Sequence, residues 1–239
     1  GAGKHSSTRR PPPHHHNVET VETDTYSVWM AVTDTYSEWM AVTKVPKHFL
    51  PTAPRAIKDT AKRGMSLKQL EVLGSFVGQV LNETTILDRD SKRQEWHNVH
   101  LYTVCDYIVK PLTRNFRCSF AELVAVEEQI PRWFVSHFWG TPFRQTLRML
   151  ALHSRGRGLA ESTFYYWVCT FANNQHDLTE LGGGLEATPF VRVLRSATCT
   201  GTVALMDQHA TPFRRVWCVL ECYESTMRLA AAGKKEHLY

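Results

Sequence analysis

The sequence predicts an α/β protein in which residues 131–239 form a parallel β-sheet with flanking helices. Three short apolar runs, at 132–140, 164–169 and 201–207, alternate with segments of helical periodicity, so the element order is β-α-β-α-β-α. The runs are apolar throughout instead of alternating with polar residues. Strands of this kind are buried on both faces, as in parallel sheets whose connecting helices cover them.

Each element of this domain has a local signal. The first run, R-W-F-V-S-H-F-W-G, is aromatic and β-branched and ends in glycine, which is typical of a buried strand. Pro142 lies in the first turn of a helix whose apolar face comprises Phe143, Leu147, Leu150 and Ala151. F-Y-Y-W-V-C and G-T-V-A-L-M-D are the second and third strands, with a helix over 186–197 between them. Thr211 caps and Pro212 opens the last helix, which runs to about Ala231.

Residues 65–130 are predicted to form a helical N-terminal extension. Ser66 is placed as the N-cap of a helix of about four turns, because apolar residues recur at helical spacing at Leu67, Leu70, Leu73, Val77, Val80 and Leu81. A second helix is predicted over 100–109 and is expected to stop at Pro111. A third apolar segment covers 120–126.

Residues 1–64 are predicted to be a disordered tail, a repeat and a linker. The tail is polar and contains runs of proline and histidine without apolar periodicity. The repeat is T-D-T-Y-S-V-W-M-A-V at 23–32 followed by T-D-T-Y-S-E-W-M-A-V at 33–42. Two copies are too few to stack as a solenoid, which favours a duplication in a tolerant linker. The alternative is that Trp29 and Trp39 form a docking patch.

Net charge, the length of the apolar runs and the cysteine pattern limit the kinds of protein this chain can be. The formal net charge is +5 in 239 residues, with the excess spread along the chain, so no nucleic-acid partner is predicted. No apolar run reaches 18 residues, and no apolar secretory segment opens the chain, so neither a membrane span nor secretion is predicted. The six cysteines form no CxxC pair, and most lie in apolar runs. We therefore expect a reducing, cytoplasmic location.

Polar residues follow each predicted strand, at the edge of the sheet where open α/β folds bind ligands. They are Ser136, His137 and Trp139 after the first strand, Asn173, Asn174 and Gln175 after the second, and Asp207 after the third. Each of the three loops also supplies a histidine, namely His137, His176 and His209. This grouping favours a rim that receives a nucleotide-like ligand. The alternative is that these residues cap helices and form turns, as such residues usually do.

Glu221 is the carboxylate that the last helix places nearest to apolar surface. Phe213, Trp217, Leu220 and Glu224 are predicted to share a buried stripe, and Glu221 lies one turn from Trp217 at the border of that stripe. Partial desolvation there raises the pKa of a carboxyl group, and such groups often act in chemistry. The alternative is an ordinary surface ion pair with Arg214 or Arg228.

The motifs resemble those of TIR domains. W-C-x-x-E, at Trp217, Cys218 and Glu221, is similar to the W-C-x-x-E-L signature on the third TIR helix, although Cys222 replaces the leucine. F-V-S-H-F-W-G, Y-W-V-C-T-F-A-N-N-Q-H-D-L and G-T-V-A-L-M-D stand where the first strand, the second strand with its BB loop, and the third strand belong. Together with C-S-F-A-E-L-V they resemble a TIR-like family of protist and algal proteins over roughly residues 99–228.

The resemblance implies a flavodoxin-like or TIR-like sheet. TIR folds have five strands and this chain supplies three, so we expect a partial domain whose sheet is incomplete at the C-terminal end. In enzymatic members the glutamate cleaves NAD, which implies that Glu221 is catalytic and NAD is a substrate, with no bound cofactor. The implied substrate-binding residues are Ser136, His137, Trp139, Asn173, Asn174, Gln175, Asp207 and Trp217. The alternative implied by the family is a non-catalytic module that self-associates or recruits protein partners.

Two further interpretations rank below these. A Cys-His hydrolase would use Cys169 with His137 or His176, but no glycine-flanked elbow accompanies the cysteine. A metal site from His137, His176 and Asp207 lacks the spacing of a ligand set, so no metal is predicted.

Overall fold

The computed structural model describes residues 44–232, with side chains described as far as Met227. These residues belong to one compact unit. The predicted disordered tail and the decapeptide repeat at 23–42 lie outside the described residues.

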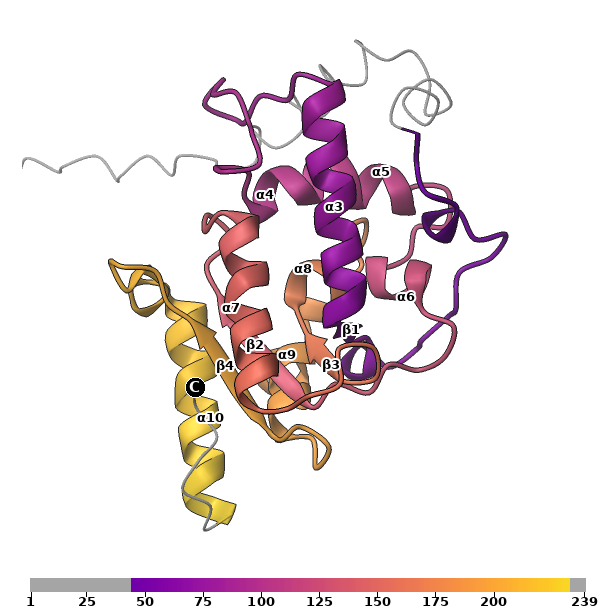
Figure 1. Cartoon of the computed structure of the whole chain (residues 1–239). Helices are drawn as coiled ribbons and strands as arrows, with labels where there is room; N and C mark the ends of the chain where they lie inside the picture. The colour runs from indigo at the N-terminus through magenta and orange to yellow at the C-terminus, as the bar shows by residue number, and fades with distance from the viewer. Residues whose placement is uncertain (1–43, 233–239) are drawn as a thin grey trace, which may run out of the picture. The chain divides into compact units, whose positions relative to one another are not determined.

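The sheet has four strands in the order β1-β3-β2-β4 (Figure 1). They are β1 (Met65–Ser66), β2 (Trp133–His137), β3 (Tyr165–Trp167) and β4 (Gly201–Leu205). Strand β2 is central and runs parallel to both β3 and β4, pairing with β4 over its whole length. The short strand β1 pairs antiparallel with β3. The predicted α/β class with parallel strands is confirmed, and the second and third predicted strands lie on opposite sides of the first.

Helices cover both faces of the sheet. Side chains of a strand alternate between faces, and Trp133 meets His153 of α7 (Phe143–Gly156), with ring centroids 4.5 Å apart. On the other face, Ser136 contacts α10 (Val216–Ala232). Helix α9 (Pro189–Arg195) packs beside α10. Odd-numbered residues of β2 therefore face α7, and even-numbered residues face α9 and α10.

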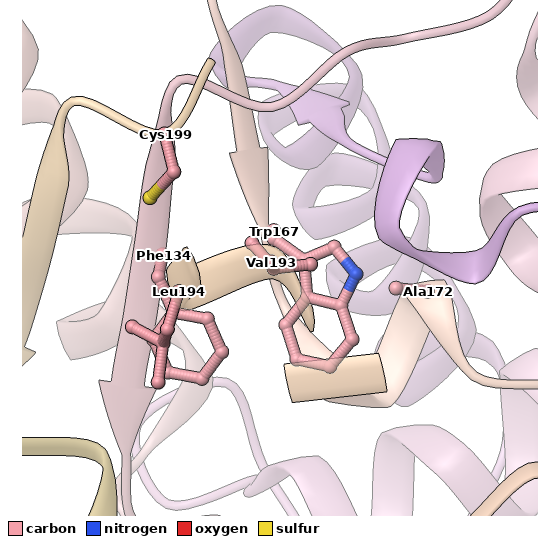
Figure 2. Close-up of a cluster of buried hydrophobic side chains, with 6 residues drawn as sticks. All are labelled: Phe134, Trp167, Ala172, Val193, Leu194 and Cys199. Carbon is pink, nitrogen blue, oxygen red and sulfur yellow. The ribbon is translucent and has the colours of Figure 1, made fainter. Parts of the chain in front are cut away.

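A cluster of buried apolar side chains joins β2 and β3 to α9 (Figure 2). It comprises Phe134, Trp167, Ala172, Val193, Leu194 and Cys199. The rings of Phe134 and Trp167 stack with centroids 5.2 Å apart and planes 15° apart. The indole of Trp167 donates a 2.9 Å hydrogen bond to the carbonyl of Thr60, so its polar atom is satisfied within the cluster. The cluster fixes the two parallel strands relative to the helix layer that also holds α10.

The N-terminal extension packs onto this sheet. Helix α3 (Leu67–Glu83) begins at Ser66, whose side chain forms a capping box with Gln69, so the predicted N-cap is confirmed. Helix α3 packs against α7. Strand β1 lies immediately before α3 and was missed by the sequence analysis, because a two-residue strand carries no periodic signal.

The prediction that Pro111 ends the second helix is wrong. The segment runs through α4 (Leu101–Val104), a π-helical turn (Cys105–Val109) and α5 (Lys110–Thr113). Proline lacks the N–H that an α-helix interior needs, and here it lies at the start of α5, directly after the wider π turn. The third apolar segment is α6 (Phe120–Val124), with a capping box between Ser119 and Glu122.

Two other predicted elements are shorter in the structure than the sequence predicts. The second strand stops at Trp167, and Cys169 starts the single-turn helix α8 (Cys169–Ala172). The last helix is interrupted at Arg215, whose extended backbone separates a 3₁₀ turn from α10. The remaining short 3₁₀ turns are Lys47–Phe49, Thr60–Lys62, Thr179–Leu181, Leu185–Ala187 and Thr211–Arg214.

Two further findings concern membrane-spanning helices and the state of the cysteines. Among residues 44–232, no helix has the length and apolar character needed to cross a membrane. All six cysteines lie within the described residues and carry free thiols.

Candidate functional site

The carboxylate of Glu221 reaches from α10 to the carboxyl end of β2. The hydroxyl of Ser136 donates a 2.5 Å hydrogen bond to its Oε2 atom. Ser136 is fully buried and lies opposite Ala204 of β4 in the sheet register. One turn further along α10, the hydroxyl groups of Ser225 and Thr202 of β4 are 2.6 Å apart, which fixes the helix on the strand. The hydrogen bond between Ser136 and Glu221 joins two segments that are 85 residues apart in sequence.

Burial raises the pKa of Glu221 to about 7, because removal from water disfavours the charged carboxylate. The hydrogen bond from Ser136 acts in the opposite direction, since it favours the charged form, but it only partly offsets burial. No ion pair to Glu221 exists among the side chains that the structure describes, so the predicted alternative pair with Arg214 is absent. The side chain of Arg228 lies outside those described. A carboxyl group of this kind changes charge near neutral pH.

Three thiols lie close enough to this carboxyl group for its charge to affect them, those of Cys169, Cys218 and Cys222. Burial is the main cause that raises the pKa of Cys169 to about 12 and that of Cys218 to about 11, and it also raises the pKa of Cys222. The negative charge of Glu221 adds to the shift in all three. These thiols stay neutral at physiological pH, which argues against Cys169 as a nucleophile because the thiolate is the reactive form.

His137 and Trp139 take different positions at the end of β2. His137 follows Ser136 within the strand, so its side chain points to the opposite face, toward α7. It is buried, which lowers its pKa to about 4, and its Nε2 atom makes no hydrogen bond within residues 44–232. The indole of Trp139 donates to Sγ of Cys169 at 3.1 Å, and its ring lies 5.3 Å from that of Tyr102. The side chain of Trp139 therefore contacts the Cys169 thiol, whereas His137 is connected to these thiols only through its backbone carbonyl, which accepts a hydrogen bond from the thiol of Cys218 at 3.5 Å.

The loop after β3 is tied mainly to the N-terminal extension. Asn174 donates to the carbonyl of Arg117 at 2.7 Å, and His176 Nε2 lies 2.9 Å from the hydroxyl of Thr113. Gln175 donates to the carbonyls of Cys169 and Thr170, which closes the loop onto α8.

Three of these polar groups thus hold the loop in place, as the alternative interpretation of the sequence expects. Asn173 differs, because its Oδ1 atom is buried and has no partner within the described part of the chain.

Asp207 and Trp217 do not face Glu221. Oδ1 of Asp207 accepts hydrogen bonds from the backbone N–H groups of His209 and Thr211, so it organises its own turn. A side-chain hydrogen bond with Thr211 and these backbone bonds lower the pKa of Asp207. Trp217 is 52% exposed and packs edge-on against Phe190, with ring centroids 5.2 Å apart.

The predicted buried stripe on the last helix is therefore wrong. Phe213 and Trp217 face outward, while Cys218, Cys222 and Ser225 form the buried face. Sequence reasoning ranks bulky residues as buried, but a helix seated closely on a sheet favours small ones. The thiols were missed for this reason, and the i, i+4, i+7 spacing of small residues at 218, 222 and 225 is the signal that could have found them.

No three His, Cys, Asp or Glu side chains are grouped to hold a metal ion in the part of the chain that the structure describes. No protein-family model, curated protein or solved structure matches the chain.

Proposed function

We propose that this chain is a TIR-like domain with a flavodoxin-like strand order, and that it hydrolyses the bond between nicotinamide and ribose in NAD through Glu221. Its motifs resemble the TIR signature, and the residue that matches the signature glutamate is Glu221. The flavodoxin-like order is supported by the placement of β3 and β4 on opposite sides of β2.

The observation that carries the proposal is the 2.5 Å hydrogen bond between Ser136 and Glu221. The connections from β2 to β3 and from β3 to β4 lead to opposite sides of the central strand. Ligands of open α/β sheets bind beyond the carboxyl ends of the strands at such a reversal. Ser136 is the penultimate residue of β2, so the hydrogen bond fixes a carboxyl group at this edge.

The chemistry suits a carboxylate. When the C1′–N bond of NAD breaks, its electron pair goes to the pyridine nitrogen, and nicotinamide leaves as a neutral molecule that needs no proton. Positive charge develops at C1′ and the ring oxygen, as in glycoside hydrolysis. Ionised Glu221 would stabilise this charge in surroundings of low polarity. Water then adds to C1′, and its proton passes to the carboxylate and on to solvent.

Only some of the residues predicted to bind the substrate keep a role in this proposal. Glu221, positioned by Ser136, contacts the reacting ribose, and Trp139 supplies an aromatic wall. Asn173 adds a buried amide oxygen that could accept a hydrogen bond from the ligand. Asn174, Gln175, Asp207, Trp217 and His137 take no direct part in this proposal, since each is engaged elsewhere or points away.

The test is incubation of the purified 239-residue chain with NAD, with free nicotinamide measured by chromatography. Glu221→Gln keeps the shape of the side chain and an acceptor for Ser136 but removes the negative charge. We expect nicotinamide release to fall by about 10²–10³-fold, because electrostatic and proton-transfer contributions of one group are of this size.

Glu161→Gln is the matched control, since Glu161 is an exposed acid on the loop before β3. It should release nicotinamide at the wild-type rate. Equal rates for Glu221→Gln and wild type, or no release by the wild type at any pH between about 6 and 9, a range that spans the titration of Glu221, would refute the proposed activity.

A further inference from the structure

The outer face of α10 is mostly apolar and carries no charged side chain between residues 216 and 227. Its exposed side chains between residues 216 and 227 are Val216, Trp217, Val219, Tyr223, Thr226 and Met227. None of them is charged. The two acids of this stretch are engaged on the inner side, Glu221 with Ser136 and Glu224 with Arg195. Phe213, just before the helix, extends the same apolar surface.

Helix α7 shows what a water-facing helix of this protein looks like. Its exposed residues include Arg144, Arg148 and Arg155, and one large apolar side chain, Leu152. A single exposed leucine is ordinary on a protein surface. A continuous uncharged face is not ordinary, and such faces mark contact with another molecule.

The apolar residues follow the helix axis. Val216, Val219, Tyr223 and Met227 are separated by three, four and four residues, which places them on one stripe. The stripe is about 16 Å long at 1.5 Å per residue. A stripe of this spacing is complementary to a second helix lying along it.

We propose that the outer face of α10 is a two-fold interface at which two copies of this chain pack their α10 helices antiparallel. Under this symmetry the ends of the stripe exchange, so Val216 and Trp217 of one copy meet Met227 of the other. The middle of the stripe pairs with itself, so Val219 of one copy meets Tyr223 of the other.

Charge and area both favour a second copy. No charged side chain meets its own image at the axis, because the face carries none. The exposed side chains offer roughly 500 Å² per copy. This is at the low end of specific interfaces, so we expect a dimer with a dissociation constant of roughly micromolar size. The interface does not depend on the proposed activity of Glu221.

The experiment measures the mass of the full chain by sedimentation equilibrium between about 1 and 100 µM, a range that brackets the expected dissociation constant. Wild type should move from monomer, 27.4 kDa, to dimer across this range. Val219→Lys and Tyr223→Glu should each remain monomeric. An equimolar mixture of the two should form a heterodimer, because the two-fold axis sets the introduced ammonium group of one copy against the introduced carboxylate of the other. Leu152→Glu, on α7, should dimerise like wild type.

A wild-type chain that stays monomeric at about 100 µM would overturn the proposal and leave a different protein as the occupant of this face. Homodimers that survive both charged substitutions would overturn it as well, because the contact would then lie elsewhere. Failure of the mixed variants to associate, with each variant shown to be folded by circular dichroism, would reject the antiparallel two-fold arrangement. None of these outcomes alters the test of NAD cleavage.

Discussion

Two regions of the molecule each hold a largely buried glutamate beside a serine, and they are built differently. In the first region, Glu122 of α6 accepts hydrogen bonds from the backbone of Ile57 and from both the backbone and the hydroxyl of Ser119. It also pairs with the buried guanidinium of Arg63 at 3.4 Å. In the second region, Glu221 accepts one side-chain hydrogen bond, from Ser136, and has no cation beside it among the described side chains.

The difference separates a structural acid from a candidate functional acid. The donors and the cation around Glu122 compensate its charge, and they connect the linker, the extension and α6. Glu221 is partly buried without such compensation, and the loss of contact with water raises its pKa to about 7. Incompletely compensated carboxyl groups are destabilising in their charged form, and proteins retain them where chemistry needs a titratable group.

The largest expected effect comes from Glu122→Gln. The substitution leaves Arg63 buried without its main counter-charge, so the free energy of unfolding should fall by about 3 kcal/mol or more. Urea unfolding near neutral pH, followed by circular dichroism, measures this. The matched substitution Glu221→Gln should not lower stability at that pH. Similar losses from both substitutions would mean that the two regions do not differ as described.

A second prediction concerns the pH dependence of stability. The folded chain holds the Glu221 proton up to about pH 7, while the unfolded chain releases it near the ordinary value of 4.5. Wild-type stability should therefore fall relative to Glu221→Gln as pH rises from 4.5 to about 7, and the gap should then level off. We expect a gap on the order of 2 kcal/mol, after allowance for partial solvent contact. A gap that stays constant across this pH range would contradict the raised pKa.

Ser136→Ala sharpens the comparison further. The hydroxyl favours the charged form of Glu221, so its removal should raise the pKa of that carboxyl further. If ionised Glu221 cleaves NAD, the midpoint of the pH–rate curve for nicotinamide release should move upward by the same amount. An unchanged midpoint, with activity retained, would show that the hydrogen bond does not tune Glu221.

The smallest expected effect is that of Ser119→Ala. This serine closes the capping box of α6, and removal of such a cap costs about 1 kcal/mol. Because Glu122 retains Arg63 and the backbone donors, the loss in unfolding free energy should not exceed that of an ordinary helix cap. A loss as large as that of Glu122→Gln would show that the hydroxyl of Ser119, and not Arg63 and the backbone donors, holds Glu122 in place.

The sequence predicted the three parallel strands and the α3 cap, because each has a local or periodic signal, and it also predicted that desolvation raises the pKa of Glu221. Ser136 was among the predicted site residues, but its hydrogen bond to Glu221 could not be predicted, since the contact depends on how α10 is seated on a strand 85 residues away. The placement of His137 could have been corrected from the sequence alone, because consecutive residues of a strand face opposite ways. The orientation of α10 was predicted wrongly, since small cysteines and a serine face the sheet while Trp217 faces outward.

The most direct test of the central claim is a ¹³C NMR titration of the glutamate side-chain carboxyl carbons in the folded wild-type chain, with Glu221→Gln used to assign the Glu221 signal. The account predicts that this carboxyl titrates with a midpoint near 7. A midpoint near 4.5, the ordinary value for glutamate, would show that the charge of Glu221 is compensated after all, and the basis for its proposed role would be lost.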